Sequence, residues 1–422
     1  MTGRHIPSRW HGSLLGNDFR ANRTVRYSIE ESGSGFKSQE VETVLHSSHR
    51  SYRPVDIKMG PDGAVYIVDW YNPIIDHGEV DFHHPLRDKS HGRIWRLTAI
   101  DQPLLEWPVI AEATTPELFE HLTSDEQYTR TQANRELVRR QTSREEIDEW
   151  IKSLDETDPA HGHHLLEALW LAHALNLEAN GLEDAPLRDA DPRIRAAAVR
   201  AVGRTSNGLA HLAKAVGDSH PRVRLAAVCA LRDLGTKEAS DVVLGALDHE
   251  VDLNLDFALE MAVRDTRDAW LPALQAGERV FGGNANSLSY ALNKAQDKRA
   301  IGGLAEIIAE GQLKGSALNN AITTVASLGS PEQMGELLQK AQDHPDWLPA
   351  IAQGVRYNAK EPPLKSRAMM FLNSKVADIR IAAAGLCGAW KVSSAEDLLA
   401  KGAKDSKTIK EAEAMADALA RI

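Results

Sequence analysis

The pattern of apolar and polar positions changes once along this chain, near residue 100. Before that point, apolar residues alternate with polar ones in short segments such as residues 25–29 and 41–45. Alternation with a period of two is typical of β-strands that are buried on one face. From about Pro116 onward the period is 3.6, which predicts amphipathic α-helices. The sequence therefore predicts a β part followed by a long α part.

The segment 60–97 is the most informative part of the β region. It reads GPDGAVYIVDW, then a loop over residues 71–91, then GRIWRL, so two predicted strands flank the loop. The first strand follows a turn in which Pro61 presets φ, Asp62 bonds its own backbone and Gly63 supplies φ > 0. A loop of this length in a compact domain is usually functional or disordered. Short strands at this spacing predict a sandwich or a propeller.

The α region contains an internal repeat. DPRIRAAAVRAVG (191–203) aligns with HPRVRLAAVCALR (220–232) at an offset of 29 residues, and seven of the 12 positions from the proline onward are identical. Weaker copies occupy residues 249–262 and 376–390. Asp or His followed by Pro predicts a helix start. Since one helical pair cannot bury its own apolar face, the pairs are expected to stack. The unit resembles a short HEAT repeat.

The β region resembles a known propeller type. The runs SYRPVD (51–56), GPDGAVYIVDWYNPII (60–75) and HGRIWR (91–96) together resemble the closing blade of a six-bladed propeller of the glucose/sorbosone dehydrogenase type. The order of propeller and HEAT-like helices is similar to that of large bacterial membrane-bound dehydrogenases. The resemblance implies a partial β-propeller, the last one to two blades, in residues 1–100. A linker over 101–118 and a HEAT-repeat α-solenoid over 119–422 would follow.

The number of predicted strands bears on completeness. They suffice for about one and a half blades, whereas a propeller closes only when its last blade meets its first. The chain is therefore expected to be a C-terminal piece of a longer protein. The alternative is a short protein in which a small sheet caps the end of a solenoid.

The resemblance also implies a cofactor. In this dehydrogenase type, pyrroloquinoline quinone is held with calcium in the central channel, and cationic side chains suit its carboxylates. The matching positions here are Arg20, at the end of WHGSLLGNDFR (10–20), and Arg53, in the turn before the last GPDG strand. The alternative for each arginine is a salt bridge between blades. The family's catalytic histidine lies in an earlier blade that nothing here matches, so the catalytic residue is unknown.

The loop between the two strands is a candidate metal site. Acidic residues and histidines crowd it: Asp76, His77, Glu79, Asp81, His83, His84, Asp88 and His91. Mixed oxygen and imidazole ligands would suit zinc, manganese or iron. His77 and His91 are the best candidates, because both lie in stretches that the family pattern shares. No helical i, i+4 pair is present, and the alternative is a polar loop whose groups hold it to the propeller face.

Charge and cysteine content narrow the function classes. Residues 1–100 carry 13 Lys and Arg against 12 Asp and Glu, and the rest carries 36 against 48. An acidic scaffold is poorly suited to phosphate backbones, so nucleic acid is disfavoured as a partner. No apolar run long enough for a transmembrane segment occurs, and no signal-peptide pattern is visible. Cys229 and Cys387 lie in Ala-rich helical stretches and are expected to be small buried thiols.

Two functions follow as hypotheses. In the first, the chain is a fragment, inactive by itself, of a quinone-dependent dehydrogenase that oxidises a sugar or polyol in the periplasm or another extracytoplasmic compartment. In the second, the propeller is a non-catalytic carbohydrate- or protein-binding platform and the solenoid docks a protein partner. Whether the protein is an enzyme stays open at this point, since a fold does not determine a function.

Overall fold

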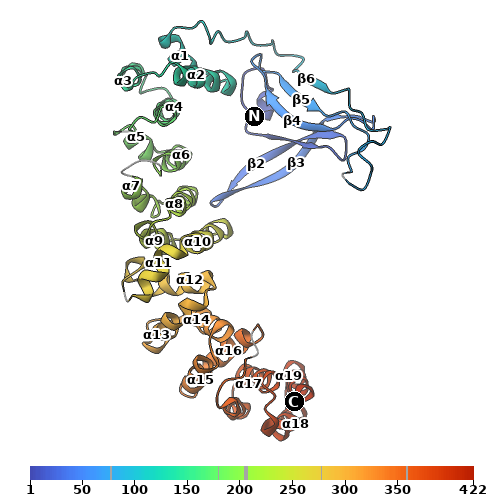
Figure 1. The fold of residues 1–422 in the computed structure, drawn as a ribbon, viewed down its shortest axis with the longest axis vertical. Coiled ribbons are helices and arrows are strands. Elements are labelled where there is room, and N and C mark those ends of the chain that lie inside the picture. The colour runs from blue at the N-terminus through green and yellow to red at the C-terminus, as the bar shows by residue number, and fades with distance from the viewer. Residues whose placement is uncertain (77, 179, 204–207, 277, 358–359) are drawn as a thin grey trace. The chain divides into compact units, whose positions relative to one another are not determined.

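The computed structural model describes residues 1–422 except 77, 179, 204–207, 277 and 358–359 (Figure 1). Contacts between residues divide the chain into two compact units, one of residues 1–211 and 218–226 and the other of residues 212–217 and 227–422. The first unit contains the strands and the first helices, and the second contains the later helices.

Two antiparallel sheets lie in the first unit, and the described strands follow the orders β1-β2-β3 and β4-β5-β6. The bounds of the strands are β1 Leu14–Asp18, β2 Arg23–Ser32, β3 Gly35–His46, β4 Pro54–Met59, β5 Val65–Asp69 and β6 Arg93–Leu97. Each sheet is a meander, because neighbouring strands also follow one another in the sequence. The first strands of the two sheets, β1 and β4, lie against each other.

The predicted turn before β5 is confirmed. Gly63 has a φ of 76°, and the Asp62 carboxylate accepts a hydrogen bond of 3.1 Å from the backbone N–H of Ala64. The other Asp62 oxygen accepts from the hydroxyl of Tyr66 at 2.9 Å and also pairs with Arg96. The turn thus bonds to two strands of its own sheet.

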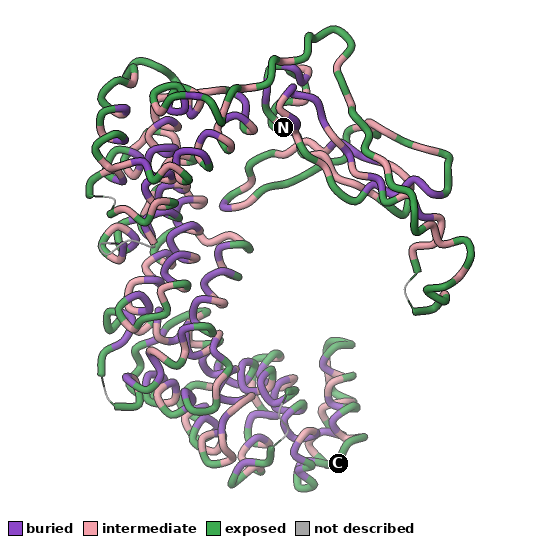
Figure 2. The backbone as a smooth tube through the Cα atoms, turned by 45° about the horizontal axis from the view of Figure 1, so that its top comes forward, coloured by how far each residue is buried: buried purple, intermediate pink, exposed green. Residues whose placement is uncertain are grey.

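The core of the sheet part lies between the two sheets. Val65 and Ile67 of β5 are fully buried and pack against Leu15 of β1 and Leu45 of β3. Figure 2 colours the backbone by burial and shows buried stretches in the sheet part as well as in the helices. Of the residues that alternate in the sequence, Val25 is buried and Leu45 packs against this core, whereas Val41 of β3 is exposed. The opposite face of the second sheet keeps Val55 and Ile94 exposed.

The rest of the chain is helical. The α-helices are α1 Thr115–Leu122, α2 Gln127–Arg139, α3 Arg144–Ser153, α4 His161–Ala174, α5 Asp184–Leu187, α6 Pro192–Val202, α7 Gly208–Ala215, α8 Pro221–Leu234, α9 Lys237–Val243, α10 Leu253–Asp265, α11 Arg267–Gln275, α12 Ala285–Ala295, α13 Ile301–Ala309, α14 Gly315–Leu328, α15 Pro331–Lys340, α16 Leu348–Val355, α17 Ala377–Ala389, α18 Glu396–Asp405 and α19 Ile409–Arg421. Short 3₁₀ helices are η1 Ser8–Trp10, η2 Leu244–Asp248, η3 Phe281–Gly283, η4 Lys298–Ala300, η5 Pro345–Trp347, η6 Lys365–Asn373 and η7 Ser393–Ala395.

Successive helices stack as a solenoid. In the first unit α2 packs on α4 and α4 packs on α6. In the second unit the series α10, α12, α14, α16, α17 and α19 continues in the same way. Where the structure describes the chain, no helix is both long and apolar enough to cross a membrane.

The structure confirms only part of the propeller prediction. The described strands form two three-stranded antiparallel sheets and do not close into a propeller. The last strand ends at Leu97 and α1 begins at Thr115. The proposed domain boundaries at residues 100 and 118 stay predictions.

The predicted helix starts in the repeat are confirmed. α6 begins at Pro192 and α8 at Pro221. The Asp191 carboxylate accepts a hydrogen bond from the backbone N–H of Arg193 at 2.7 Å, which caps α6. Nδ1 of His220 accepts from the corresponding N–H of Arg222 at 3.3 Å. Asp and His therefore serve as equivalent caps in the two copies.

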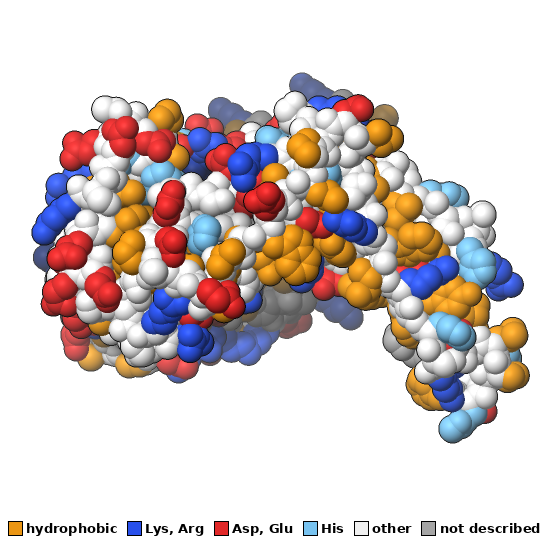
Figure 3. Space-filling view, turned by 90° about the horizontal axis from the view of Figure 1, so that it is seen from above, with side chains coloured by type: hydrophobic (Ala, Val, Ile, Leu, Met, Phe, Trp, Pro, Cys, Tyr) orange, Lys and Arg blue, Asp and Glu red, His pale blue; other side chains and the backbone are white. Residues whose placement is uncertain are grey.

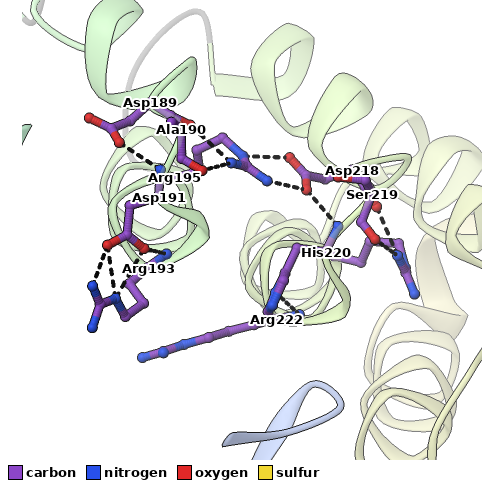
Figure 4. Close-up of polar contacts among 10 residues, drawn as sticks. Asp189, Ala190, Asp191, Arg193, Arg195, Asp218, Ser219, His220 and Arg222 are labelled. Atoms are coloured by element: carbon purple, nitrogen blue, oxygen red, sulfur yellow. Dashed lines mark hydrogen bonds and ion pairs between the residues drawn. The ribbon is translucent and has the colours of Figure 1, made fainter.

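Arg195 joins one repeat to the next (Figure 4). Its Nε and Nη2 atoms donate to the two carboxylate oxygens of Asp218 at 2.9 and 2.8 Å. Its Nη1 atom donates to the carbonyl of Asp189, six residues earlier, at 2.9 Å. Arg195 therefore bonds both the turn before its own helix and the turn of the neighbouring repeat.

The same arrangement recurs at other arginines. Nη1 of Arg130, Arg224 and Arg380 also donates to the carbonyl six residues earlier. Arg130 bonds Glu167 on α4 through Nε at 3.0 Å, and Arg380 bonds Glu411 on α19 through Nη2 at 2.9 Å. We call the pairs of Arg130, Arg195 and Arg380 with these carboxylates the arginine ladder.

The cysteines differ in burial. Cys387 is fully buried, as expected, and burial raises the pKa of its thiol to about 12. Cys229 is half-buried. The raised pKa leaves the Cys387 thiol protonated and inert at neutral pH.

Replacing Arg195 should destabilise the first unit far more than replacing Arg193. Arg195→Ala leaves the Asp218 carboxylate, whose side chain is only 16% exposed, without its bidentate partner. We expect the free energy of unfolding to fall by about 2–4 kcal/mol. Arg193 also pairs with an aspartate, but its side chain is 67% exposed, so Arg193→Ala should cost about 0.5 kcal/mol or less. Urea unfolding followed by circular dichroism measures both, and equal losses would contradict the ladder.

Candidate functional site

Arg53 is a structural clamp in this chain. Its guanidinium is almost fully buried and donates to backbone carbonyls on two segments: Nε to Asn72 at 3.0 Å and Nη1 to Phe19 at 2.8 Å. Nη2 donates to Pro73 at 3.4 Å. Burial lowers the pKa of Arg53, with a further contribution from the nearby charge of Arg50. These bonds engage all three of its nitrogens with backbone carbonyls, and the cofactor role of Arg53 stays a prediction.

Arg20 lies beside Arg53 but is exposed. It occupies the turn between β1 and β2, and its carbonyl accepts a hydrogen bond of 3.4 Å from Nη1 of Arg53. The structure therefore brings the two predicted cofactor residues together. Of the two, Arg20 is the one with the exposure that a quinone contact requires.

Asp69 at the end of β5 organises this end of the sheet. Its side chain is fully buried, and one carboxylate oxygen accepts from the backbone N–H groups of Arg53 and Tyr71 at 2.8 and 2.9 Å. The other accepts from Nε of Arg93 at 3.0 Å and Nε1 of Trp95 at 3.1 Å. Burial alone would raise the pKa of Asp69, but these hydrogen bonds outweigh it and hold the pKa below its usual value.

His91 pairs with Asp88 in the long loop. Nδ1 of His91 lies 2.8 Å from Oδ2 of Asp88, and backbone N–H groups of Ser90 and His91 bond the same carboxylate. These bonds, with that of Ser90 the largest, lower the pKa of Asp88 to about 2. His77 lies outside the described residues. Among the rest, no group of three or more His, Cys, Asp or Glu side chains is placed to hold a metal ion, so the metal role of His77 and His91 stays a prediction.

Arg87 explains the form of the long loop. Its guanidinium donates to the carbonyls of Asp76, Val80 and Asp81 at 2.7–3.0 Å and lies 5.2 Å from the ring centre of Phe82. The loop is thus folded around a cation. Its acidic residues contribute through their backbone oxygens here, which supports the structural interpretation of the loop.

Aromatic and basic side chains gather near Asp69. The guanidinium of Arg93 lies 4.1 Å from the ring centre of Tyr71 and 5.1 Å from that of Trp95. Tyr71 also stacks on His49, with 5.6 Å between ring centres. In Figure 3 the sheet region shows hydrophobic, basic and histidine side chains together, while acidic side chains are numerous over the helices. Cation–π contacts of this kind stabilise a surface cluster by about 1 kcal/mol each.

A second candidate site lies on the solenoid, around Trp170 of α4. Two adjoining hollows of 560 and 380 Å³ share this half-buried side chain. α2 lines the first with Gln127, Thr131, Asn134 and Arg135, and α6 lines the second with Ala197, Arg200 and Ala201. We call this the Trp170 surface.

Glu167 fixes the floor of the Trp170 surface. Its Oε1 atom accepts from Nε of Arg130 at 3.0 Å and lies 3.2 Å from Nε2 of His163. The His163 ring contacts Trp170 edge-on, with 5.9 Å between ring centres. The ladder pair Arg130–Glu167 therefore also positions the aromatic side chain. His164, in the first turn of the same helix, is buried, and burial lowers its pKa.

Sequence reasoning missed the Trp170 surface. A signal was present: the run LLEALWLAHAL (165–175) is apolar around nearly the whole helix. A helix of this kind is buried on more than one side or offers an apolar surface to a partner. Arg130 and Arg135 carried no recognisable repeat pattern.

Comparisons with known proteins define the helical part. Residues 179–264 match a family model described as HEAT repeats, and residues 1–101 match one described as a domain of unknown function (DUF7133). No curated protein matches the chain. Residues 179–264 of the solenoid thus match HEAT repeats, and the comparisons assign no dehydrogenase or propeller to the β part.

Solved structures similar to this chain are repeat and engineered proteins. A crystal structure of an engineered protein from the Northeast Structural Genomics Consortium is 14% identical, with a TM-score of 0.29, and covers 73% of this chain and 98% of its own. A designed armadillo repeat protein is also 14% identical, with a TM-score of 0.15, and covers 73% and 99%.

Replacing Asp69 should loosen the sheet part in a pH-dependent way. Asp69→Asn places an amide N–H₂ donor against groups that are themselves hydrogen-bond donors. We therefore expect the free energy of unfolding to fall by about 2–3 kcal/mol near pH 7. A carboxylate with a lowered pKa stabilises the fold above its unfolded pKa of about 3.9, and this contribution disappears as the pH falls through the folded value. The difference between variant and wild type should therefore shrink as the pH falls below about 3.9.

Urea unfolding at several pH values, followed by tryptophan fluorescence, tests this expectation. Asp56→Asn is the matched control, because Asp56 lies in the same sheet and is exposed beside an exposed Lys58. The control should leave the free energy of unfolding nearly unchanged, because an exposed ion pair contributes little to stability. A pH-independent loss in Asp69→Asn would contradict the role of the carboxylate.

Proposed function

We propose that this protein is a HEAT-repeat interaction scaffold whose Trp170 surface binds a segment of a partner protein. The observation that carries the proposal is the pair of adjoining hollows that share Trp170 across α2, α4 and α6. Aromatic side chains at the centre of a hollow are the common anchors of protein interfaces. HEAT repeats also commonly mediate protein interactions.

The lining of the Trp170 surface indicates the chemistry of its ligand. Trp170 offers an apolar face for one side chain of the partner. The amides of Gln127 and Asn134 each offer a donor and an acceptor, which suits a peptide backbone. Arg135 is exposed and adds a positive charge at the edge. A peptide segment with an apolar anchor next to a carboxylate satisfies all of these groups.

Substitutions in the Trp170 surface should weaken peptide binding. Peptides selected from a displayed random library against the full chain serve as probes, and fluorescence anisotropy measures their affinity. Trp170→Ala should weaken the selected peptides by more than tenfold, and Arg135→Glu by about five- to tenfold.

The control for charge is Lys152→Glu, which makes the same change at an exposed position of α3, outside the surface. It should leave the affinity within about twofold. Because Trp170 also packs against the neighbouring repeat, circular dichroism confirms that each variant is folded. Selection of no peptide, or peptides that bind Trp170→Ala and Arg135→Glu as well as wild type, would overturn the proposal.

As a second candidate function, we propose that the two sheets are blades of a quinone-dependent sugar or polyol dehydrogenase of extracytoplasmic location. The observation that favours it is the packing of β1 against β4, since the first strands of adjacent meanders would be neighbours in a propeller. The described residues of this chain offer no complete site, because Arg53 is occupied by backbone carbonyls.

Equilibrium dialysis against pyrroloquinoline quinone with and without calcium tests this second candidate. We expect weak, calcium-dependent retention of quinone that Arg20→Ala reduces severalfold. Arg9→Ala is the matched control and should leave the retention unchanged, because Arg9 is also an exposed arginine of this region. Absence of retention by the wild-type chain, or equal retention by Arg20→Ala, would count against a cofactor role for Arg20.

A further inference from the structure

A long groove in the second unit is separate from both candidate sites. It lies along α17 between α16 and α19 and has a volume of 1010 Å³. Its floor consists of small side chains on all three helices: Ala352, Ala382, Gly385, Ala389, Ala414 and Ala418. We call it the α17 groove.

Two glycines of the groove's helices lie at close contacts with neighbouring helices. A Cβ atom added at Gly388 of α17 would lie 2.8 Å from the Cα of Ala418 on α19, so only glycine fits there. Gly354 of α16 is likewise close to its neighbour, where an added Cβ would lie 2.5 Å from the carbonyl oxygen of Thr323. The first contact holds α17 close to α19, and the second holds α16 close to α14, the helix that contains Thr323.

Gly385 marks the open part of the groove. It is exposed on α17, and an added Cβ would meet no atom within 4 Å. Glycine in a helix interior costs about 1 kcal/mol relative to alanine. No contact within the chain therefore explains why this position lacks a side chain. A partner that approaches α17 closely would explain it.

The rim of the α17 groove is basic in an acidic chain. Arg356, Lys391, Lys410 and Arg421 outnumber Asp378 and Asp417 there, although the chain carries a net charge of −11. Lys410 lies 3.9 Å from Asp378, and both are exposed. The other three cations have no ion pair within 4.0 Å among the described residues. The local charge is thus opposite in sign to that of the whole protein.

We propose that the α17 groove docks an acidic segment of a partner protein, with small apolar side chains against the floor and carboxylates toward the rim. The charge of the rim complements carboxylates and would steer such a segment to this face. The apolar floor and the two rim carboxylates are unsuited to a phosphate backbone, which needs cations along its whole length. This surface is distinct from the Trp170 surface, and neither proposal depends on the other.

Gly385 supplies a sharp test. Gly385→Leu places a side chain at a position where an added Cβ meets no atom within 4 Å. Gly385→Ala is the matched control, because it adds one methyl group and slightly stabilises the helix. The probes are fluorescein-labelled peptides, selected from a displayed random library against the full chain and grouped by whether Gly385→Leu abolishes their binding. We expect the sensitive group to be rich in Asp and Glu, with affinity lost more than tenfold in Gly385→Leu and retained within about twofold in Gly385→Ala.

A charge variant and two controls complete the test. The double substitution Lys410→Glu and Arg421→Glu should weaken the same peptides about tenfold and reduce the salt dependence of their affinity. Arg135→Glu should not affect them, which separates this site from the Trp170 surface.

Several outcomes would overturn the proposal. One is that the peptides sensitive to Gly385→Leu are not enriched in Asp and Glu. Another is that no selected peptide is sensitive to Gly385→Leu although the circular dichroism of this variant is native. A third is that a labelled oligonucleotide competes with the peptides for the groove.

Discussion

The structure depends on an arginine that bonds backward and forward at once. In the ladder, Nη1 binds the carbonyl six residues earlier, and the rest of the guanidinium binds a carboxylate of the following repeat, as Arg195 does with Asp218. A solenoid has no common core, because each repeat touches only its neighbours. Apolar packing of small Ala and Val side chains is not directional. The planar guanidinium therefore sets the spacing and angle between repeats.

Part of this could be predicted from the sequence. Arg195 and Arg224 stand at equivalent positions of a visible repeat, and the helix starts at Pro192 and Pro221 follow from turn chemistry. Arg130 was not recognisable, since the residues around it contain neither the proline nor the alanine run. The carboxylate partners lie 37, 23 and 31 residues beyond their arginines, so no fixed spacing reveals them.

The sheet end shows the same limit. Sequence pattern identified Arg53 as an important arginine and predicted the turn at Gly63. It could not tell that the guanidinium meets the carbonyls of Phe19 and Asn72, because those segments come together only in the fold. The sequence pattern around a cationic side chain near a predicted channel is the same whether that side chain binds a ligand or bonds the backbone. The Trp170 surface was invisible for a related reason, since it combines residues of three separate helices.

The ladder also determines where positive charge remains available. Arginines that join repeats are largely buried against carboxylates, as Arg130 and Arg380 are, and add little to the surface field. The acidic excess of the helical part is then left on the outside. Against that background, cations on the rim of the α17 groove and at Arg135 are local exceptions. Such local groups of cations would attract an acidic partner, so the pairing that holds the repeats together also sharpens where a partner docks.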